Sequence, residues 1–410
     1  ASIFSYRSIN RCRHSGIAGR QPTGAGTSEI MKIEYKKGIG MNFIPRTIRN
    51  IFKIHEHARH QSAIRTIIRH STLRKLVNLL LVETEFRLRS TRVYGRPYIL
   101  SVDPTNICNL RCPLCPTGTH EQGRKGTTMT WQTFQHTVDM AAPYAYKVNF
   151  FNWGEPLLHP RLFDMIRYAN DNNIGTTLSS NFSVELDDET IDHIITSGLE
   201  FLTLSIDGAS QSTYSIYRKK GDLDLVLSNL ARLVKRRTEL NSKTPVIEWQ
   251  FLPMKHNEHE EETARQLAMS MEVDVFRCIP VGLPFWSTDR PALREQWYPA
   301  GDRHQHSRGG IDITRSEKAE TSCYFLYRYL TVNPDGKISP CCVTYGEDTD
   351  FADIHTDDIP TLMNNAQYRS ARSLYRKNGQ VIVPTACDSC HLFVKHASRA
   401  GHPQSIIATD

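Results

Sequence analysis

The sequence Cys108-Asn-Leu-Arg-Cys112-Pro-Leu-Cys115 spaces its thiols by three and then two residues, directly after the apolar run Tyr98–Val102. That run predicts a short buried strand. Each iron of a cubane iron–sulfur cluster needs a ligand, so three thiolates leave one iron open to a small bidentate ligand. A structural zinc site is the alternative, although no fourth ligand stands nearby at a familiar spacing. The motif therefore predicts a metal centre at the carboxyl end of a strand, where barrel active sites lie.

Strands and helices alternate after this motif. The pattern predicts strands at 147–151, 176–179, 201–206, 246–252 and 273–279, and helices at 160–172, 188–197, 223–239 and 260–271. Short connections between such units favour parallel strands covered by helices. With about six units, too few for eight-fold closure, we expect an α/β fold with a partial (β/α)6 TIM-like barrel over residues 93–280.

The pattern changes after Pro280. Residues 281–322 contain several Pro and Gly, Trp286 and Trp297, and predict a connector or substrate-facing loop. Tyr324–Val343 predicts a β-hairpin that turns at Asn333-Pro334-Asp335-Gly336. A helix is expected over Ile359–Lys377, before a final Cys-x-x-Cys. Residues 323–400 are therefore expected to form a second domain, followed by a tail over 401–410.

The N-terminal region is basic. Residues 1–75 hold fifteen Lys/Arg and three Glu, although the whole chain has a net charge of only +7. We expect residues 1–41 to be a disordered leader or tag-like tail, for which an acid-poor mitochondrial presequence is an alternative. Residues 42–92 predict a basic amphipathic helical arm. Its apolar stripes are Ile48, Ile51 and Phe52, then Ile64, Ile67 and Ile68.

The arm has three interpretations. It is a helix packed on the enzyme, a patch that touches an anionic membrane, or a nucleic-acid contact. We favour the first, keep peripheral membrane contact as the alternative, and expect no nucleic-acid partner. No apolar run approaches the ~20 residues that a membrane-spanning helix needs.

The cysteines fall into two sets. Eight of the ten belong to Cys108/112/115 or to Cys323/341/342/387/390, and Cys12 and Cys278 stand apart. Clustered thiols without a convincing secretion signal indicate metal or redox sites in a reducing compartment. We therefore expect a cytoplasmic protein.

Polar motifs follow the later strands. They are Trp153-Gly154-Glu155-Pro156, Ser180 with Asn181, Ser205-Ile-Asp207-Gly208, and Arg218. Together with the cysteine motif, and in this order at predicted strand ends, they resemble the motifs of radical S-adenosylmethionine (SAM) enzymes. The family's motif GGEP here has Trp153 at a position where glycine is usual. Leu114 precedes the third cysteine, where the family often has an aromatic residue.

The resemblance implies a site for SAM. Cys108, Cys112 and Cys115 would hold a [4Fe–4S] cluster whose open iron binds the amino and carboxylate groups of SAM. The motif of Gly154, Glu155 and Pro156 would hold the amino group, and Ser205 and Asp207 would lie near the ribose and carboxylate. Arg218 would pair with the carboxylate, and Ser180 and Asn181 would add polar contacts.

The second cysteine set also resembles a family element. Cys323, Cys341, Cys387 and Cys390 could close a zinc site or ligate a [4Fe–4S] cluster. The run Gly336–Cys341, followed by a helix and Cys387-x-x-Cys390, is similar to the SPASM/Twitch extension behind radical SAM barrels. With five cysteines here instead of seven, the extension resembles the Twitch type with one auxiliary [4Fe–4S] cluster, as in 2-deoxy-scyllo-inosamine dehydrogenase.

Three cysteines are left over, of which Cys12 is expected to be incidental. Neighbouring residues on a strand face opposite sides, so Cys341 and Cys342 should not both reach one cluster. We expect Cys341 to be the ligand and Cys342 a packed thiol. Cys278 is expected to be a small buried hydrophobe rather than a group that faces the barrel interior.

The resemblance implies an oxidoreductase of the dehydrogenase or epimerase type. The 5′-deoxyadenosyl radical formed from SAM would abstract hydrogen from a small polyol, sugar or cyclitol-like substrate. An electron donor such as flavodoxin or ferredoxin would reduce the first cluster. The alternatives are a peptide-modifying maturase and a zinc-stapled binding protein. No catalytic acid or base is assigned, and Asn149, Asn152, Gln250 and Trp286 are substrate-facing candidates by position alone.

Overall fold

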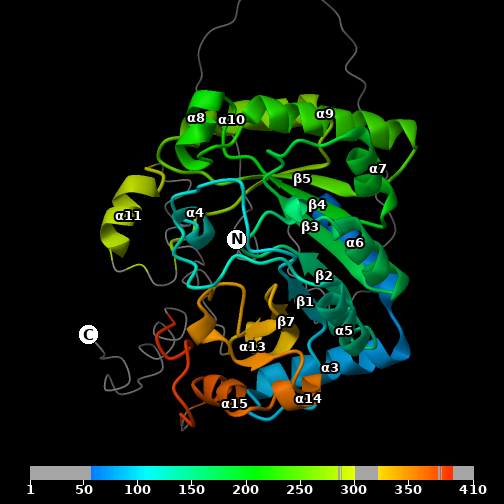
Figure 1. Ribbon diagram of the computed structural model, residues 1–410, viewed down its shortest axis with the longest axis vertical. Coiled ribbons are helices and arrows are strands. Elements are labelled where there is room, and N and C mark those ends of the chain that lie inside the picture. The colour runs from blue at the N-terminus through cyan, green and yellow to red at the C-terminus, as the bar shows by residue number, and fades with distance from the viewer. Residues whose placement is uncertain are drawn as a thin grey trace, which may run out of the picture.

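A nine-stranded sheet organises the chain in this computed structural model, which describes residues 57–284, 287, 289–300, 322–376, 379 and 381–390. The strand order is β6-β5-β4-β3-β2-β1-β7-β8-β9, and β6 through β7 all run parallel. The strands are β1 Ile99–Val102, β2 Lys147–Phe150, β3 Gly175–Ser180, β4 Phe201–Ser205, β5 Val246–Phe251, β6 Val275–Cys278, β7 Tyr329–Val332, β8 Lys337–Ser339 and β9 Ala352–Asp353. The expected partial barrel of parallel strands is confirmed (Figure 1).

Helices cover the outer face of this sheet (Figure 1). Those of the barrel are α5 Trp131–Ala141, α6 Leu162–Asp171, α7 Asp188–Thr196, α8 Gln211–Tyr217, α9 Leu223–Glu239 and α10 Glu261–Ser270. The elements predicted for the barrel are confirmed, with ends that shift by one or two residues. The sequence pattern missed α5 and α8. Each follows a hydroxyl cap, Thr130 or Ser210, which accepts a hydrogen bond from the third backbone N–H beyond it.

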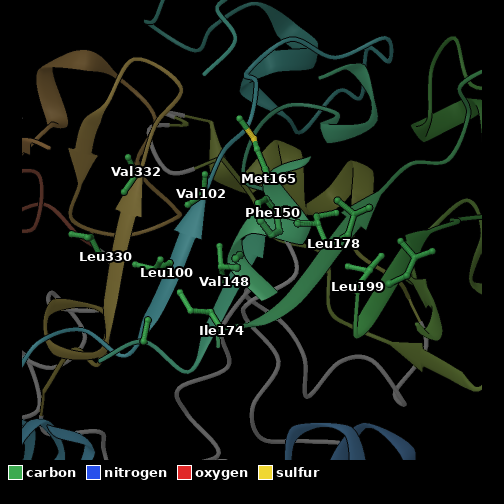
Figure 2. Close-up of a cluster of buried hydrophobic side chains, with 14 of the residues drawn as sticks. Leu100, Val102, Val148, Phe150, Met165, Ile174, Leu178, Leu199, Leu330 and Val332 are labelled. Carbon is green, nitrogen blue, oxygen red and sulfur yellow. The ribbon is translucent and has the colours of Figure 1, made fainter. Parts of the chain in front are cut away.

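The main core lies between the sheet and these helices. Figure 2 shows part of it, including Leu100 and Val102 of β1, Val148 and Phe150 of β2, and Met165 of α6. Alternate residues of a strand face opposite sides, so Ser101 and Asn149 lie on the inner face of the sheet. Outer apolar and inner polar residues together fix the register of each strand.

The C-terminal domain extends the barrel sheet. β7 pairs in parallel with β1, and the backbone N–H of Asp103 donates to the carbonyl of Val332 at 3.0 Å. The hairpin of β7 and β8 is confirmed, and its turn contains Gly336 at a positive φ of 83°. However, the predicted hairpin was too long, because its first residues form the helix α13, Phe325–Arg328. Packing of Phe325 and Leu326 in the core overrides the strand pattern there.

Two further predictions in this region are corrected. The helix expected over Ile359–Lys377 is two helices, α14 Ile359–Leu362 and α15 Ala366–Ser373. The break is at Asn365, whose side chain caps α15 by accepting from Tyr368 N at 3.0 Å. The expected connector 281–322 contains the helix α11, Arg290–Trp297. Short pieces complete the fold: α4 Pro116–Thr119, η2 Pro156–Leu158, η3 Glu258–Glu260 and η5 Glu347–Thr349.

The described part of the basic arm, residues 57–92, forms two helices, α2 His57–His70 and α3 Leu73–Leu88. Both pack at the amino ends of the strands. His70 lies 2.7 Å from Glu200 and 3.0 Å from Asn173, which precede β4 and β3. The arm is therefore packed on the enzyme, as we favoured. In the described part of the chain, no helix combines the length and hydrophobicity that crossing a bilayer requires.

Several predictions fall on residues outside the described ranges. These are the tail 1–41, the stripe of Ile48, Ile51 and Phe52, the candidate Trp286, most of the connector after Ala300, and the tail 401–410.

Glu83 joins the arm to both domains. Its carboxylate is buried, accepts from Tyr98 Oη at 2.8 Å, and accepts from Arg328 Nη2 at 2.8 Å. Removing one charge of a buried pair leaves the other uncompensated. We expect Glu83→Gln to lower the free energy of unfolding by about 3 kcal/mol, measured by urea denaturation.

The matched control is Glu239→Gln, which loses a half-exposed ion pair with Arg236 on α9. Such exposed pairs contribute under about 1 kcal/mol. Equal destabilisation by the two variants would contradict the assigned importance of Glu83.

Candidate functional site

The first cysteine set lies in the loop that leaves the carboxyl end of β1. Its last member, Cys115, stands before α4, and Pro116 at the first helical position suits the start of a helix. Gly118 in α4 packs directly on the backbone of Cys112, where an added Cβ would come within 2.4 Å of the carbonyl oxygen. A glycine is therefore required for α4 to fold back on the loop and fix its path.

The three thiols share one buried neighbourhood. Burial, and then the nearby charge of Glu155, raise the pKa of Cys108 to about 12, with smaller contributions from Cys112 and Cys115. Burial likewise raises the pKa of Cys112 to about 11. Donors point at the sulfurs: Leu110 N lies 3.4 Å and Asn181 Nδ2 3.8 Å from Cys108 Sγ. Cys108 and Cys112 are therefore protonated at neutral pH unless a metal displaces the protons.

Glu155 is held by the end of β3. Its Oε1 accepts from Ser180 Oγ at 2.8 Å and from Leu157 N at 3.1 Å, and its Oε2 accepts from Asn181 N at 2.7 Å. Burial raises the pKa of this carboxyl, and the same donors lower it. A carboxylate has about four acceptor sites, so one remains for a cationic group. Ser180 and Asn181 therefore contact the Glu155 carboxylate, and an effect of these donors on SAM would pass through Glu155.

A close approach fixes the turn before Glu155. A Cβ at Gly154 would lie 1.7 Å from the carbonyl oxygen of Thr105, so only glycine fits against the cysteine loop. Glu155 N donates to Ile107 O at 2.9 Å. The buried Asp103 accepts from Trp153 N at 3.2 Å, and burial raises the pKa of Asp103 to about 7. The sequence motif missed Asp103, although an acid directly after β1 was a visible signal.

Asp207 and Arg218 form a buried pair beside Cys112. Arg218 Nε donates to Asp207 Oδ2 at 2.6 Å, and Arg218 Nη1 lies 3.9 Å from Cys112 Sγ. Leu252 N donates to the other oxygen of Asp207 at 2.7 Å. Burial raises the pKa of Asp207, and the guanidinium opposes that rise. The structure thus joins two motif residues that the sequence left separate, whereas Ser205 lies half-buried at the end of β4.

An apolar cluster covers this side of the cysteine loop. It contains Leu110, Leu114, Tyr217, Leu252, Ile279 and Trp297, among others. Trp297 belongs to α11 and packs edge-on against Tyr217 at 5.6 Å between ring centroids. Leu114 is therefore packed against apolar neighbours. The cluster shields the thiols of this loop from water on one side.

Trp153 faces the C-terminal domain. Its indole N–H donates to Thr344 O at 3.3 Å, and its ring meets Tyr345 edge-on at 5.4 Å. Nearby, the buried Arg124 Nη2 donates to Asp350 at 2.6 Å. The residue that departs from the usual glycine therefore connects the turn after β2 with the segment after Cys341.

The second cysteine set also converges. Burial raises the pKa of Cys387 well above the ordinary thiol value, and its neighbours Cys341, Cys390 and Cys323 add to the rise. Cys323 is influenced by Cys341 and Cys390 in the same way. These four thiols are the set that the sequence selected.

Cys342 belongs to an aromatic cluster against which Cys323 and Cys341 also pack. It is buried beside Phe151, Phe325 and Tyr329, and among the thiols only Cys341 contributes to its raised pKa. The expected reason was wrong, because β8 ends at Ser339 and no strand alternation applies to Cys341 and Cys342. The expected outcome, a packed thiol, agrees with the structure.

The remaining candidates have different surroundings. Cys278 packs against the main apolar core. Asn149 lines a cavity of about 110 Å³ that α2 closes at the amino ends of the strands. Asn152 lies beside Cys342 O and the Trp153 indole, toward the C-terminal domain. Gln250 is buried on the inner face and accepts from Arg277 Nη2 at 2.9 Å.

Both thiol sets fit an iron–sulfur cluster by the chemistry of their donors. The first offers three thiols with N–H donors near two of the sulfurs, and hydrogen bonds to sulfur tune such clusters. The second offers four thiols. Within the described ranges, no group of three or more His, Cys, Asp or Glu side chains lies close enough together to hold a metal ion.

Comparisons with known proteins agree with this chemistry. Residues 102–263 match the Radical SAM superfamily, and residues 323–391 match the SPASM iron-sulfur cluster-binding domain. The first segment contains Cys108, Cys112 and Cys115, and the second contains Cys323, Cys341, Cys387 and Cys390. These domains bind SAM and iron–sulfur clusters.

The chain is similar to proteins with different reactions. It is 28% identical to an AdoMet-dependent heme synthase of Methanosarcina barkeri, over 30% of this chain and 34% of that protein. It is 21% identical to the PqqA peptide cyclase of Gluconobacter oxydans, over 60% of this chain and 70% of that protein. Among solved structures, SuiB of Streptococcus suis bound to S-adenosylmethionine has a TM-score of 0.54 at 14% identity, covering 85% of this chain and 80% of that one. The SuiB likeness supports the fold.

The close approach at Gly154 generates a test of the site. In Gly154→Ala the added Cβ must displace the turn that carries Glu155. A shift on the order of 1 Å disrupts a positioned site, so we expect SAM affinity to fall at least about tenfold. Isothermal titration of SAM into anaerobically reconstituted protein measures this, with iron content determined in parallel.

The matched control is Gly282→Ala, because an added Cβ at Gly282 has nothing within 4 Å. This variant should bind SAM like the wild type. If both alanine variants bind SAM equally well, Gly154 does not position the site.

Proposed function

We propose that this radical SAM enzyme with a SPASM domain oxidises or epimerises a small polar molecule of the polyol, sugar or cyclitol class. The polar inner face of the barrel carries this proposal, because hydroxyl-rich substrates need hydrogen-bonding partners that an apolar pocket lacks. Those partners must lie near the carboxyl ends of the strands, where the SAM motifs are.

The inner face is polar on neighbouring strands. Its buried members include Ser101, Thr203, Glu248, Gln250, Arg277 and Thr331, whereas Asn149 and Thr177 line the cavity at the amino ends of the strands. They alternate with outward apolar residues, of which Figure 2 labels Leu100, Val148 and Leu330. A barrel that needed only a packed core would fill this face with branched aliphatic residues.

A neutralised charge pair stands on this face, formed by Glu248 in the middle of β5 and Arg277 next to the last residue of β6. Arg277 Nε donates to Glu248 Oε2 at 3.0 Å, and Arg277 Nη2 donates to Gln250 Oε1 at 2.9 Å. A paired guanidinium and carboxylate offer donors and acceptors without a large net charge. This arrangement favours a neutral, hydroxyl-bearing substrate over an anion.

The contacts at the strand ends support a proposed set of residues for the first cofactor site. Cys108, Cys112 and Cys115 would hold the cluster, with Glu155 on the SAM amino group and Arg218 on its carboxylate. Gly154, Pro156, Ser180, Asn181, Ser205 and Asp207 complete the proposed set. When bound, SAM and the reduced cluster supply a 5′-deoxyadenosyl radical that takes hydrogen from an unactivated C–H bond.

The protein's own contribution is positioning and exclusion of water. Ser180 and Asn181 orient Glu155, and Asp207 holds the Arg218 guanidinium beside Cys112. Trp297 and its apolar neighbours cover the cysteine loop. Fixed polar groups in such a covered site need no reorganisation during reaction.

The second thiol set is proposed to hold an auxiliary [4Fe–4S] cluster through Cys323, Cys341, Cys387 and Cys390. Its proposed role is to accept an electron from the substrate. A flavodoxin- or ferredoxin-like protein would deliver the electron that starts each turnover.

A peptide substrate is the second candidate. The observation in its favour is the similarity to the PqqA peptide cyclase, which extends over 60% of this chain. In that case the polar inner face would receive one side chain of a bound peptide instead of a free molecule.

Adjacent cysteines give a matched test of the auxiliary site. We expect Cys341→Ala to lose about one cluster's iron, to keep 5′-deoxyadenosine formation, and to lose product formation at least about a hundredfold, as typical for removal of an essential electron acceptor. The neighbouring Cys342→Ala should keep its iron and its product, because Cys342 packs among aromatic rings. Iron analysis and chromatography of both products measure these outcomes.

Loss of iron in Cys342→Ala but not in Cys341→Ala would contradict the ligand assignment. Loss of 5′-deoxyadenosine and product together in Cys341→Ala would instead contradict the role as electron acceptor.

The substrate class is tested by isotope transfer. Perdeuterated polyols, sugars and cyclitols, and deuterated peptides, are incubated separately with enzyme, SAM and dithionite. We expect deuterium in 5′-deoxyadenosine from a member of the first group. Deuterium transfer from peptides alone would reject the small-molecule proposal, and Arg277→Met should weaken transfer from the true polar substrate.

A further inference from the structure

The outward face of α3 is apolar. Leu73, Val77, Leu80 and Leu88 are 79%, 58%, 61% and 69% exposed, and Leu76 and Leu81 are also exposed. At 3.6 residues per turn these positions form one stripe along the helix. Ile68, at the end of α2, lies close to it in the chain and is 73% exposed. A contiguous exposed apolar stripe of this kind marks an interaction surface.

Four polar residues of α3 lie on its opposite, inward face, whereas Arg74, Thr84 and Arg87 are exposed. Lys75, Asn78, Glu83 and Glu85 are all buried. Each has a fixed partner there: Lys75 Nζ donates to Asn173 O at 2.6 Å, and Glu85 accepts from Tyr94 N at 2.6 Å. The usual orientation of a surface helix is therefore reversed, and rotation cannot hide the leucines without exposing unpaired groups inside.

Along residues 61–96, the exposed charges beside the stripe are all of one sign, and exposed acids outside this segment include Asp357 and Asp358, the latter close to Arg96. Over residues 61–96, the exposed charged side chains are Arg65, Arg69, Arg74, Arg87 and Arg92, and both glutamates are buried. Arg87 lies within the stripe itself. An apolar stripe bordered by arginine is the surface of a helix that lies in the plane of a membrane interface.

We propose that the outward face of α3 docks the enzyme on an anionic lipid membrane. The leucines enter the boundary between headgroups and acyl chains, and the arginines contact the phosphates. With 16 residues, α3 is shorter than the ~20 residues needed to span a bilayer, so it lies on the surface. The proposal is independent of the substrate class.

Charge favours lipid over the two protein occupants. A second copy related by two-fold symmetry would bring the same arginines against each other. The segment 1–56 of this chain has ten Lys/Arg and three Glu, so it would meet the arginines with like charge. An anionic membrane complements both the stripe and its border, because its acyl region accepts the leucines and its headgroups attract the arginines.

The test uses the full chain and sedimentation of sucrose-loaded vesicles. One vesicle type is phosphatidylcholine alone, and the other is phosphatidylcholine with an equal amount of phosphatidylglycerol. The stripe variant is Leu73→Gln/Leu80→Gln/Leu88→Gln, and the charge variant is Arg87→Glu/Arg92→Glu. Matched controls change exposed residues elsewhere: Met269→Gln/Leu240→Gln for the stripe and Lys235→Glu/Lys243→Glu for the charges.

We expect the wild type to bind the anionic vesicles, and binding to weaken as salt is raised. The stripe variant should lose binding about a hundredfold or more, and the charge variant at least about tenfold. Both controls should bind like the wild type. Circular dichroism and iron content establish whether the variants fold. If the stripe variant does not fold, vesicle binding by the charge variant alone tests the proposal.

Other results overturn the proposal. Absence of vesicle binding by the wild type does so directly. Binding that survives both α3 variants would assign the contact to another segment, such as residues 1–56. A dimer in sedimentation velocity that the stripe variant abolishes, without vesicle binding, would assign the face to a second copy.

Discussion

The parallel pairing of β1 with β2 on one side and β7 on the other is the constraint on which both sites depend. Tyr98 N donates to Arg328 O at 3.1 Å and Asp103 N to Val332 O at 3.0 Å, so β7 follows β1 along its whole length. Parallel strands end at the same edge of a sheet. The cysteine loop after β1 and the Gly154–Glu155 turn after β2 therefore leave side by side. The auxiliary domain begins within the same sheet, which is why Trp153 can reach Thr344 and Tyr345.

Buried carboxylates give this edge its rigidity. Glu155 and Asp207 are each almost fully buried, and each has fixed partners before any cofactor binds. Burying a carboxylate is unfavourable unless hydrogen bonds or a counter-charge compensate it. Those compensating groups, Asn181 for one and Arg218 for the other, come from neighbouring strands and from the loop near Cys112. The same bonds that stabilise the two charges therefore hold the loops in position for a ligand.

Sequence reasoning succeeded where the signal is local or ordered along the chain. Strand periodicity, motif order and cysteine spacing predicted the parallel barrel and the residues that gather at its edge. It failed where contacts between residues far apart in the sequence determine the local structure. Phe325 and Leu326 form a helix because both pack in the core, and the role of Asp103 depends on the turn at Trp153. The reversal of α3 could not be predicted either, because the partners that bury Glu83 and Glu85 lie beyond the helix itself.

The proposed membrane face and the proposed substrate site lie at opposite ends of the strands. α2 and α3 contact residues just before the strands begin, such as Asn173 and Glu200, whereas Glu155 and Asp207 follow strand ends. An enzyme docked through α3 therefore keeps its carboxyl edge toward water. A substrate that arrives from water is polar, which agrees with the lining formed by Gln250 and its neighbours. A lipid substrate would instead require the apolar stripe and the cysteine loop to share one face, and the topology separates them.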